Sequence, residues 1–401
     1  MNVALNRAAS IVFGMLAAAL GHGQTSGKTV LYAAAGAELI QYDADVKDAT
    51  LIKRGSVPLP DSVQYAWPHP SRRYIYVAWS NGSGRNHHGV TAFRIDSTSG
   101  ALSPHGNRLA LANRPIHLST DISGTHLLVA SSEPSGLTVH QIGTDGTIGS
   151  QVRPSAPLDA GIYAHQVRVD PSNRTVILVT RGNGPTAGKP EDPGALKILS
   201  YRDGVVTNRA SIAPGGGFGF QPRHLDFHPT GPWVFVSLER QNKLEVYRKL
   251  ADGTLDSEPL FIKDSLADPG SARAGQVAGT VHVHPNGRFV YQANRASGAT
   301  GPTVAVGGEN TIAVYAINQQ TGEPTRIQNI DTRGMTPRTF ALDATGRILI
   351  AANQNATTAG VPAGLAVYRI RDDGKLDFAR KYDVETTAAR TLFWMGLVSL
   401  P

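Results

Sequence analysis

A strand–turn–strand unit recurs six times along this chain and limits what it can fold into. In each unit an alternating apolar strand ends at Asp or His, a Gly or Asn turn follows, and a second apolar strand leads through a polar loop to a third strand. The residues that open the turns are 49 to 59 positions apart: His69, Asp121, Asp170, His228, His284 and Asp343. A period of about 50 residues with three or four strands per unit is typical of propeller blades.

The two ends of the chain supply the strands of a seventh unit. The segment TVLYAAAGAELIQYDAD lies near the N-terminus and ARTLFWMGLVSLP lies at the C-terminus. Pairing them in one blade closes the ring and removes free edge strands that invite aggregation. Abundant Gly and Pro, sparse charge and no long amphipathic helical pattern agree with many short strands. The sequence therefore predicts an all-β, seven-bladed β-propeller, formed as one domain over residues 24–401.

Residues 1–23 have the pattern of a secretory signal peptide. Arg7 supplies a positive charge, residues 8–20 are apolar and rich in Ala, and Gly21 and Gly23 offer small residues for cleavage. The apolar run is too short for a transmembrane helix, although a membrane anchor is the alternative interpretation. We therefore expect a periplasmic or secreted protein whose mature chain does not span a membrane. The chain has no Cys, so an oxidising compartment is tolerated.

The charge distribution and the motifs indicate which kinds of ligand or partner this chain can bind. The net charge is +7, but Lys and Arg are scattered and form no basic stripe with interleaved aromatic residues. We therefore expect no nucleic-acid partner and a preference for small anionic ligands. His87 and His88 lack a carboxylate motif and make a poor metal-ligand set, so no metal or cofactor is expected. A monomer is expected.

The repeat also predicts which residues share one face of the disc. The first two strands of a blade are antiparallel, so the first begins where the second ends. We call residues at the same distance from the turn in different units a column. The column five residues before the turn opener contains His165, Arg223 and Arg338. Eight residues after the Gly or Asn of the turn, the matching column contains Arg181, Glu239, Arg295 and Gln354. We expect both columns to meet at one mouth of the central channel, from which the long loops at 80–89, 182–194, 296–309 and 354–364 also open.

Two structural interpretations accompany these columns. An Arg–Glu pair in a propeller channel can simply join neighbouring blades, because structural ion networks resemble functional sites. His69, His228 and His284 occupy the turn position that Asp takes in other units, where a side chain caps backbone N–H groups. We therefore expect these three histidines to be structural.

Several segments resemble one known family. They are PRHLDFHPTG, AHQVRVDP, VHVHPNGRFVYQANR and ENTIAVYAI, and they are similar to the seven-bladed lactonase family, which includes the propeller-type 6-phosphogluconolactonases and the fungal carboxy-cis,cis-muconate cyclases. The resemblance runs from Tyr32 to the C-terminus. It implies an active site of one His, two Arg and one Glu, which by motif are His165, Arg223, Glu239 and Arg295. Ile162–Tyr163 stand where the family often has Pro-His, and Leu238 stands where Asn often precedes the Glu.

The resemblance implies an extracytoplasmic enzyme that hydrolyses a sugar lactone or a related lactone, similar to 6-phosphogluconolactonase. Ring opening needs a base for water, donors for the developing oxyanion and an acid for the leaving alkoxide. We expect Glu239 or His165 to be the base, and Arg223 and Arg295 to hold a substrate carboxylate or a polarised carbonyl. Substrate-binding roles are expected for Arg181, Arg338 and Gln354.

Two other functions stay open from sequence. The same residues can add a carboxylate across an alkene, as in a carboxymuconate-type cycloisomerase. Alternatively, the propeller is not catalytic and binds a ligand or a partner protein. Because a phosphorylated sugar lactone is a cytoplasmic metabolite, export favours a free aldonolactone or another lactone as substrate.

Overall fold

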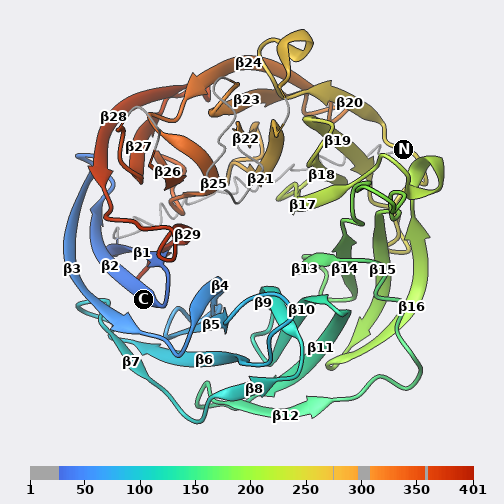
Figure 1. Ribbon diagram of the computed structural model, residues 1–401, viewed down its shortest axis with the longest axis horizontal. Helices are drawn as coiled ribbons and strands as arrows, with labels where there is room; N and C mark the ends of the chain where they lie inside the picture. Colours follow the sequence, from blue (N-terminus) through green and yellow to red (C-terminus); the bar gives the residue numbers. More distant parts are fainter. Residues whose placement is uncertain (1–26, 274, 297–307, 357–359) are drawn as a thin grey trace, which may run out of the picture.

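The computed structural model describes residues 27–273, 275–296, 308–356 and 360–401. Seven sheets surround a central channel like the blades of a propeller (Figure 1). The predicted signal peptide at 1–23 and parts of the loops at 296–309 and 354–364 lie outside the described residues. Within the described part, no helix is long and apolar enough to cross a membrane. The all-β, seven-bladed prediction is confirmed.

Six blades are each formed by consecutive strands, of which the first lines the channel and the last lies at the rim (Figure 1). The first three contain β4 (Ser62–Pro68), β5 (Tyr74–Ser80), β6 (His88–Ile95) and β7 (Leu102–Pro104); β9 (Arg114–Thr120), β10 (His126–Glu133), β11 (Ser135–Ile142) and β12 (Ile148–Val152); and β13 (Ala164–Val169), β14 (Thr175–Thr180), β15 (Ala195–Arg202) and β16 (Val205–Ile212). One short extra strand, β8 (Leu109–Leu111), pairs with β6.

The next three blades follow the same order. They contain β17 (Pro222–Phe227), β18 (Trp233–Leu238), β19 (Lys243–Arg248) and β20 (Phe261–Asp264); β21 (Val277–Val283), β22 (Phe289–Arg295), β23 (Thr311–Ile317) and β24 (Pro324–Asp331); and β25 (Met335–Leu342), β26 (Ile348–Asn355), β27 (Gly364–Ile370) and β28 (Leu376–Asp383). Two short 3-10 helices, η1 (Pro214–Gly217) and η2 (Pro269–Ser271), lie between blades.

The seventh blade joins the two ends of the described chain. Its order is β29 (Leu392–Ser399), β1 (Thr29–Ala35), β2 (Glu38–Asp45) and β3 (Thr50–Pro58). β29 and β1 are antiparallel and pair from Thr29 with Ser399 to Ala35 with Leu392. In Figure 1, β29 lies at the channel and β1 lies next to it. This pairing confirms the predicted closure of the ring.

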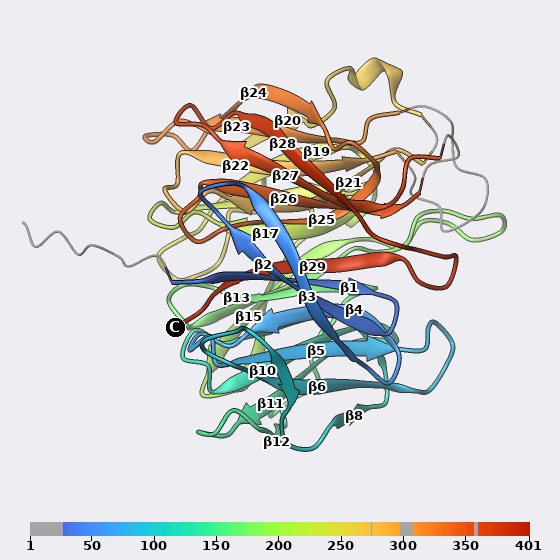
Figure 2. The same ribbon diagram turned by 90° about the vertical axis from the view of Figure 1, so that its left-hand side faces the viewer.

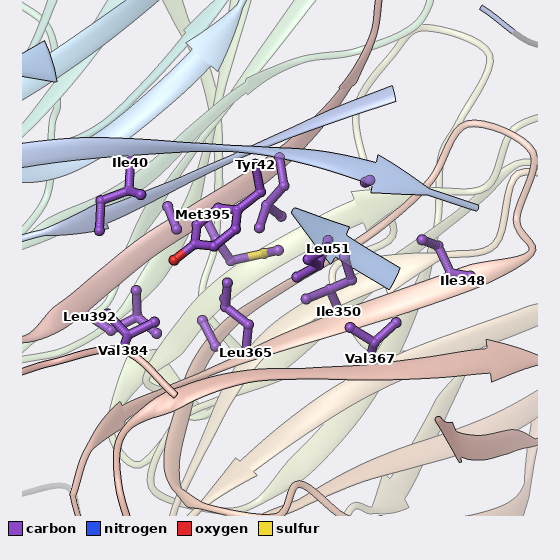
Figure 3. Packing of buried hydrophobic residues seen from close by; sticks show 14 of the residues in the cluster. Ile40, Tyr42, Leu51, Ile348, Ile350, Leu365, Val367, Val384, Leu392 and Met395 are labelled. Carbon is purple, nitrogen blue, oxygen red and sulfur yellow. The ribbon is translucent and has the colours of Figure 1, made fainter. Parts of the chain in front are cut away.

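The hydrophobic core lies between neighbouring blades rather than at one centre. Second strands such as β14 (TVILVT) and β18 (WVFVSL) are buried along their whole length. Both faces of these strands meet an adjacent blade, which explains why the sequence is continuously apolar there. Figure 3 shows one such contact, where Ile40, Tyr42 and Met395 of the closing blade pack near Ile350 and Leu365 of the preceding blade.

The histidines that open three turns also connect neighbouring blades. His228 Nδ1 accepts a hydrogen bond from Gly231 N at 2.7 Å, and its Nε2 lies 2.8 Å from Gly287 O in the next blade. His284 Nε2 likewise lies 2.9 Å from Gly346 O, and His69 Nε2 lies 2.8 Å from Gly124 O. These side chains cap their own turns, as expected, and link each turn to the following one.

The long loops after second strands open from one face of the disc. In Figure 2 the ring is seen from its side, and the loop at 182–194 projects at the right, the side toward which β5 runs. The site described next lies at this end of the channel, because it is built from the starts of first strands and the ends of second strands.

Candidate active site

The inner strand of every blade carries a β-bulge near its start. The ladder to the neighbouring strand skips one residue in six blades, and in the blade of β21 it skips Gly279 together with Thr280. We call the following seven skipped residues the bulge ring: Gln64, Ile116, His165, Arg223, Gly279, Arg338 and Phe393. A bulge leaves its extra residue unpaired and re-aims the side chain. Six of them, all except Gly279, line a narrow cavity at one end of the channel.

Glu239 follows β18, and its carboxylate forms ion pairs with guanidinium groups from three blades. Arg295 Nη2 donates to Glu239 Oε1 at 2.8 Å, and Arg181 Nη1 donates to Oε2 at 3.1 Å. Arg223 Nε lies 3.4 Å from Oε1. Burial alone would raise the pKa of Glu239, but Arg223, Arg295 and Arg181 outweigh it and hold this pKa well below its ordinary value. Glu239 is therefore a firmly ionised carboxylate and a poor proton acceptor.

The absence of a side chain at Gly279 makes room for Arg295. A Cβ at this position would lie 3.4 Å from Arg295 Nε and 3.1 Å from Ala293 Cβ. Arg295 ends β22, and its Nη2 also donates to Ala278 O at 2.7 Å. The guanidinium thus bonds both to Glu239 of the preceding blade and to the backbone of its own inner strand.

His165 is buried in the bulge of β13, with only 5 % of its surface exposed. Its ring lies 5.2 Å from the ring of His224. Burial, reinforced by the charge of Arg223, lowers the pKa of His165 well below its ordinary value, so the imidazole is neutral at neutral pH. Within the described chain its Nδ1 has no hydrogen-bond partner. A neutral imidazole with an unused ring nitrogen can accept a proton.

The site has more positive charge and more donors than Glu239 can satisfy. Burial and Arg295 lower the pKa of Arg338 to about 9, which leaves it charged at pH 7. Arg223 Nε and Nη1 and Arg295 Nε are buried without a hydrogen-bond partner among the described residues. Unpaired buried donors cost free energy. The arrangement is therefore suited to a ligand that brings oxygen acceptors.

The structure brings most of the predicted site residues together. Arg181, Arg223, Glu239 and Arg295 are in direct contact, while His165, Arg223 and Arg338 line the same cavity. Gln354 is buried near the end of β26, and no hydrogen bond or ion pair among the described residues joins it to Glu239. No cluster of three or more His, Asp or Glu side chains in the described ranges could hold a metal ion.

Two aromatic residues of the site did not emerge from the sequence columns as site residues. The guanidinium carbon of Arg181 lies 3.9 Å from the ring centre of Tyr163, and that of Arg338 lies 3.7 Å from the ring centre of Phe393. Phe393 could not be found in this way, because the first two strands of the closing blade come from opposite ends of the chain and no turn joins them. Tyr163 was visible only as a departure from the Pro-His of the resembling family.

The fold and the cluster together define a propeller with a buried, arginine-rich site at one mouth of its channel. The family model described as "Lactonase, 7-bladed beta-propeller" matches residues 25–394. The chain therefore belongs to the seven-bladed β-propeller lactonase family, which confirms the resemblance noted from its motifs.

Curated relatives and solved structures agree with this family. A 6-phosphogluconolactonase of Bacillus subtilis (strain 168) is 29% identical over 280 residues, covering 66% of this chain and 70% of the relative. One from Serratia proteamaculans (strain 568) is 28% identical over 330 residues, covering 82% and 87%. The fold is shared with the periplasmic gluconolactonase of Pseudomonas aeruginosa (TM-score 0.68, 20% identity, 93% and 100% covered). It is also shared with a putative 6-phosphogluconolactonase of Bacteroides uniformis (TM-score 0.72, 18% identity, 93% and 100% covered).

Proposed function

We propose that this protein is an extracytoplasmic lactonase that opens a sugar lactone or related lactone at the cluster of His165, Arg223, Glu239 and Arg295. The observation that carries the proposal is that a neutral, buried imidazole lies in one cavity with Arg223, whose buried Nε and Nη1 have no hydrogen-bond partner among the described residues. Membership of the lactonase family and relatives named 6-phosphogluconolactonase support it.

His165 is the better base of the two candidates, because its imidazole is neutral and its Nδ1 has no hydrogen-bond partner among the described residues, although burial and Arg223 also lower its pKa. Glu239 is stabilised as an anion by three arginines, so its proton affinity is low. His165 takes a proton from water as the water oxygen attacks the lactone carbonyl, and the carbonyl π electrons move onto oxygen. When the tetrahedral intermediate collapses, the ring C–O bond breaks and the imidazolium returns the proton to the leaving alkoxide. One water is consumed and a hydroxy acid forms.

The arginines supply the charge that this reaction requires. Buried N–H groups of Arg223 and Arg295 that have no hydrogen-bond partner among the described residues can donate to the developing oxyanion or to a substrate carboxylate. Glu239 holds these two side chains and Arg181 in fixed positions. Arg181 and Arg338 bind further substrate oxygens, and a substrate contact from Gln354 stays a prediction.

Export favours an unphosphorylated aldonolactone as the substrate. The predicted signal peptide, together with the solved neighbour described as a periplasmic gluconolactonase, supports this choice. The assay described next also tests the two alternatives, a cycloisomerase and a non-catalytic propeller. A buried site with unpaired charge is a poor docking surface for a protein, because hot spots at such surfaces are mainly exposed aromatic and arginine anchors.

The test is a pH-stat assay of glucono-δ-lactone, its 6-phosphate and a muconolactone, each corrected for spontaneous opening. We expect wild-type protein to open at least the first faster than buffer, and His165→Asn to lose about 10²–10⁴-fold in kcat, the usual contribution of a general base. Lys189→Ala, in the loop of the same face, is the matched control and should retain wild-type rates. If only the muconolactone reacts and its product is muconate, formed by elimination with no water added, the protein is a cycloisomerase. If none reacts faster than in buffer, the lactonase proposal is wrong.

A further inference from the structure

Tyr163 has an unusual backbone conformation directly beside the site. Its φ is +57°, in the left-handed region that bulky residues rarely adopt. The equivalent residues of two other blades, Gln221 and Thr336, share this conformation with φ of 41° and 56°. Each lies two residues before a member of the bulge ring. The left-handed conformation is therefore part of the backbone geometry that leads into the bulge in these three blades. The conformation is structural in origin, but only the side chain of Tyr163 is aromatic.

The ring of Tyr163 contacts two residues of the proposed site. It lies 3.9 Å from the guanidinium carbon of Arg181 and stacks over His165, with ring centres 6.2 Å apart and planes inclined by 23°. The carbonyl of Tyr163 also accepts the backbone N–H of Arg181 at 2.9 Å. One residue thus covers both the base and one of the three cations on Glu239.

Arg181 is the arginine that most needs such support. Its side chain is 24% exposed, whereas those of Arg223 and Arg295 are 2% and 4% exposed. It makes one bond to Glu239 and one from Nε to Gly182 O at 3.2 Å. A guanidinium stacked on an aromatic ring is held in one plane. Without the ring, the Arg181 side chain could turn into solvent.

We propose that Tyr163 is a positioning residue, whose ring orients Arg181 toward Glu239 and covers the His165 imidazole. This inference rests on the proposed function, because it assigns His165 and Arg181 to the reaction. The charged and titratable groups that face His165 are Arg181 after β14, Arg223 and His224 of β17, Glu239 after β18 and Arg338 of β25. The Tyr163 ring covers His165 from the segment just before β13.

The effect of the ring is tested by comparing Tyr163→Phe with Tyr163→Ala. Phe keeps the ring, so kcat/KM and its pH profile should stay within about twofold of wild type. Ala removes it, and we expect kcat/KM to fall about tenfold, which corresponds to ~1.4 kcal/mol. The acidic limb of the profile should move to higher pH, because water reaching His165 restores its affinity for protons. Gln221→Ala, at the same backbone position in the next blade, is the control and should change neither quantity.

A substrate-free measurement separates this inference from the proposed function. The imidazole of His165 is titrated by NMR in wild type, Tyr163→Phe and Tyr163→Ala. A pKa that rises in the Ala variant alone supports the positioning role, even if no lactone is opened. An unchanged His165 pKa in Tyr163→Ala, or equal damage from Phe and Ala, overturns it. If Tyr163→Ala does not fold, Tyr163→Leu keeps apolar bulk without a ring and replaces it in the same comparison.

Discussion

Glu239 shows how much one residue can organise in this molecule. Its carboxylate is the shared partner of Arg181, Arg223 and Arg295, which come from three neighbouring blades. The sequence columns predicted that these residues occupy equivalent places, because the repeat fixes their distance from each turn. They could not predict that one carboxylate would accept all three cations, since this depends on side-chain direction and on the gap at Gly279.

Replacing Glu239 by Gln should destabilise the fold as well as impair activity. The substitution leaves buried guanidinium groups without a counter-charge, and breaking a buried ion pair in this way costs about 3–5 kcal/mol. Urea unfolding at pH 7 should show this loss. Asp373→Asn, which removes an exposed partner of Arg371, is the control and should leave the free energy of unfolding almost unchanged. Equal stability of wild type and Glu239→Gln would show that Glu239 does not anchor the cluster.

At the scale of the element, each inner strand has a bulge at one end and a turn at the other, and the two features have different roles. The turn opener caps the second strand at one face, and the bulge five residues earlier aims a side chain at the other face. Turn chemistry is readable from sequence, because Asp and His exchange at that position. A bulge has no such signature, so the bulge ring and the left-handed backbone of Tyr163 emerged only from the structure.

The turn histidines offer a direct test of blade-to-blade connection. His228→Ala removes the cap to Gly231 N and the bond to Gly287 O, and unsatisfied buried groups of this kind cost about 1–3 kcal/mol each. His228→Asn keeps an acceptor for the cap but is too short to reach Gly287, so its stability should be intermediate. Chemical denaturation ranks the three proteins. If Asn is as destabilising as Ala, the bond between blades is the larger contribution.

The whole molecule encloses an unusual number of neutral histidines along its channel. His117, His165 and His224 are all buried, and for each of them burial, reinforced by neighbouring arginines, lowers the pKa well below its ordinary value. His117 and His224 lie 6.1 Å apart, and His224 and His165 lie 5.2 Å apart. The sequence columns placed His165 at the mouth of the channel, but they could not show that the rings of His117 and His224 lie close to it.

These histidines predict a steep loss of stability in mild acid. Each has a folded-state pKa below its unfolded value, so below pH ~6.5 the unfolded chain binds protons that the folded chain cannot. Stability should therefore fall by about 1.4 kcal/mol per pH unit for each histidine, or about 4 kcal/mol per unit for three. Denaturation at pH 7.5, 6.5 and 5.5 measures this slope. His224→Gln should reduce it by about a third. A constant stability down to pH 5.5 would contradict the prediction.

The bulge ring has a consequence for how such a protein can diversify. Because a skipped residue takes no part in the ladder, its identity is free of the hydrogen bonding that builds the blade. Six of the seven places in the bulge ring face a common cavity. Of these, Gln64, Ile116 and Phe393 lie outside the ion cluster around Glu239 and can be exchanged without removing one of its ion pairs. In this chain a histidine and two arginines lie among Gln64, Ile116, Gly279 and Phe393. A library that varies only the codons of Gln64, Ile116 and Phe393 would change the lining of this cavity while the ion cluster around Glu239 stays intact.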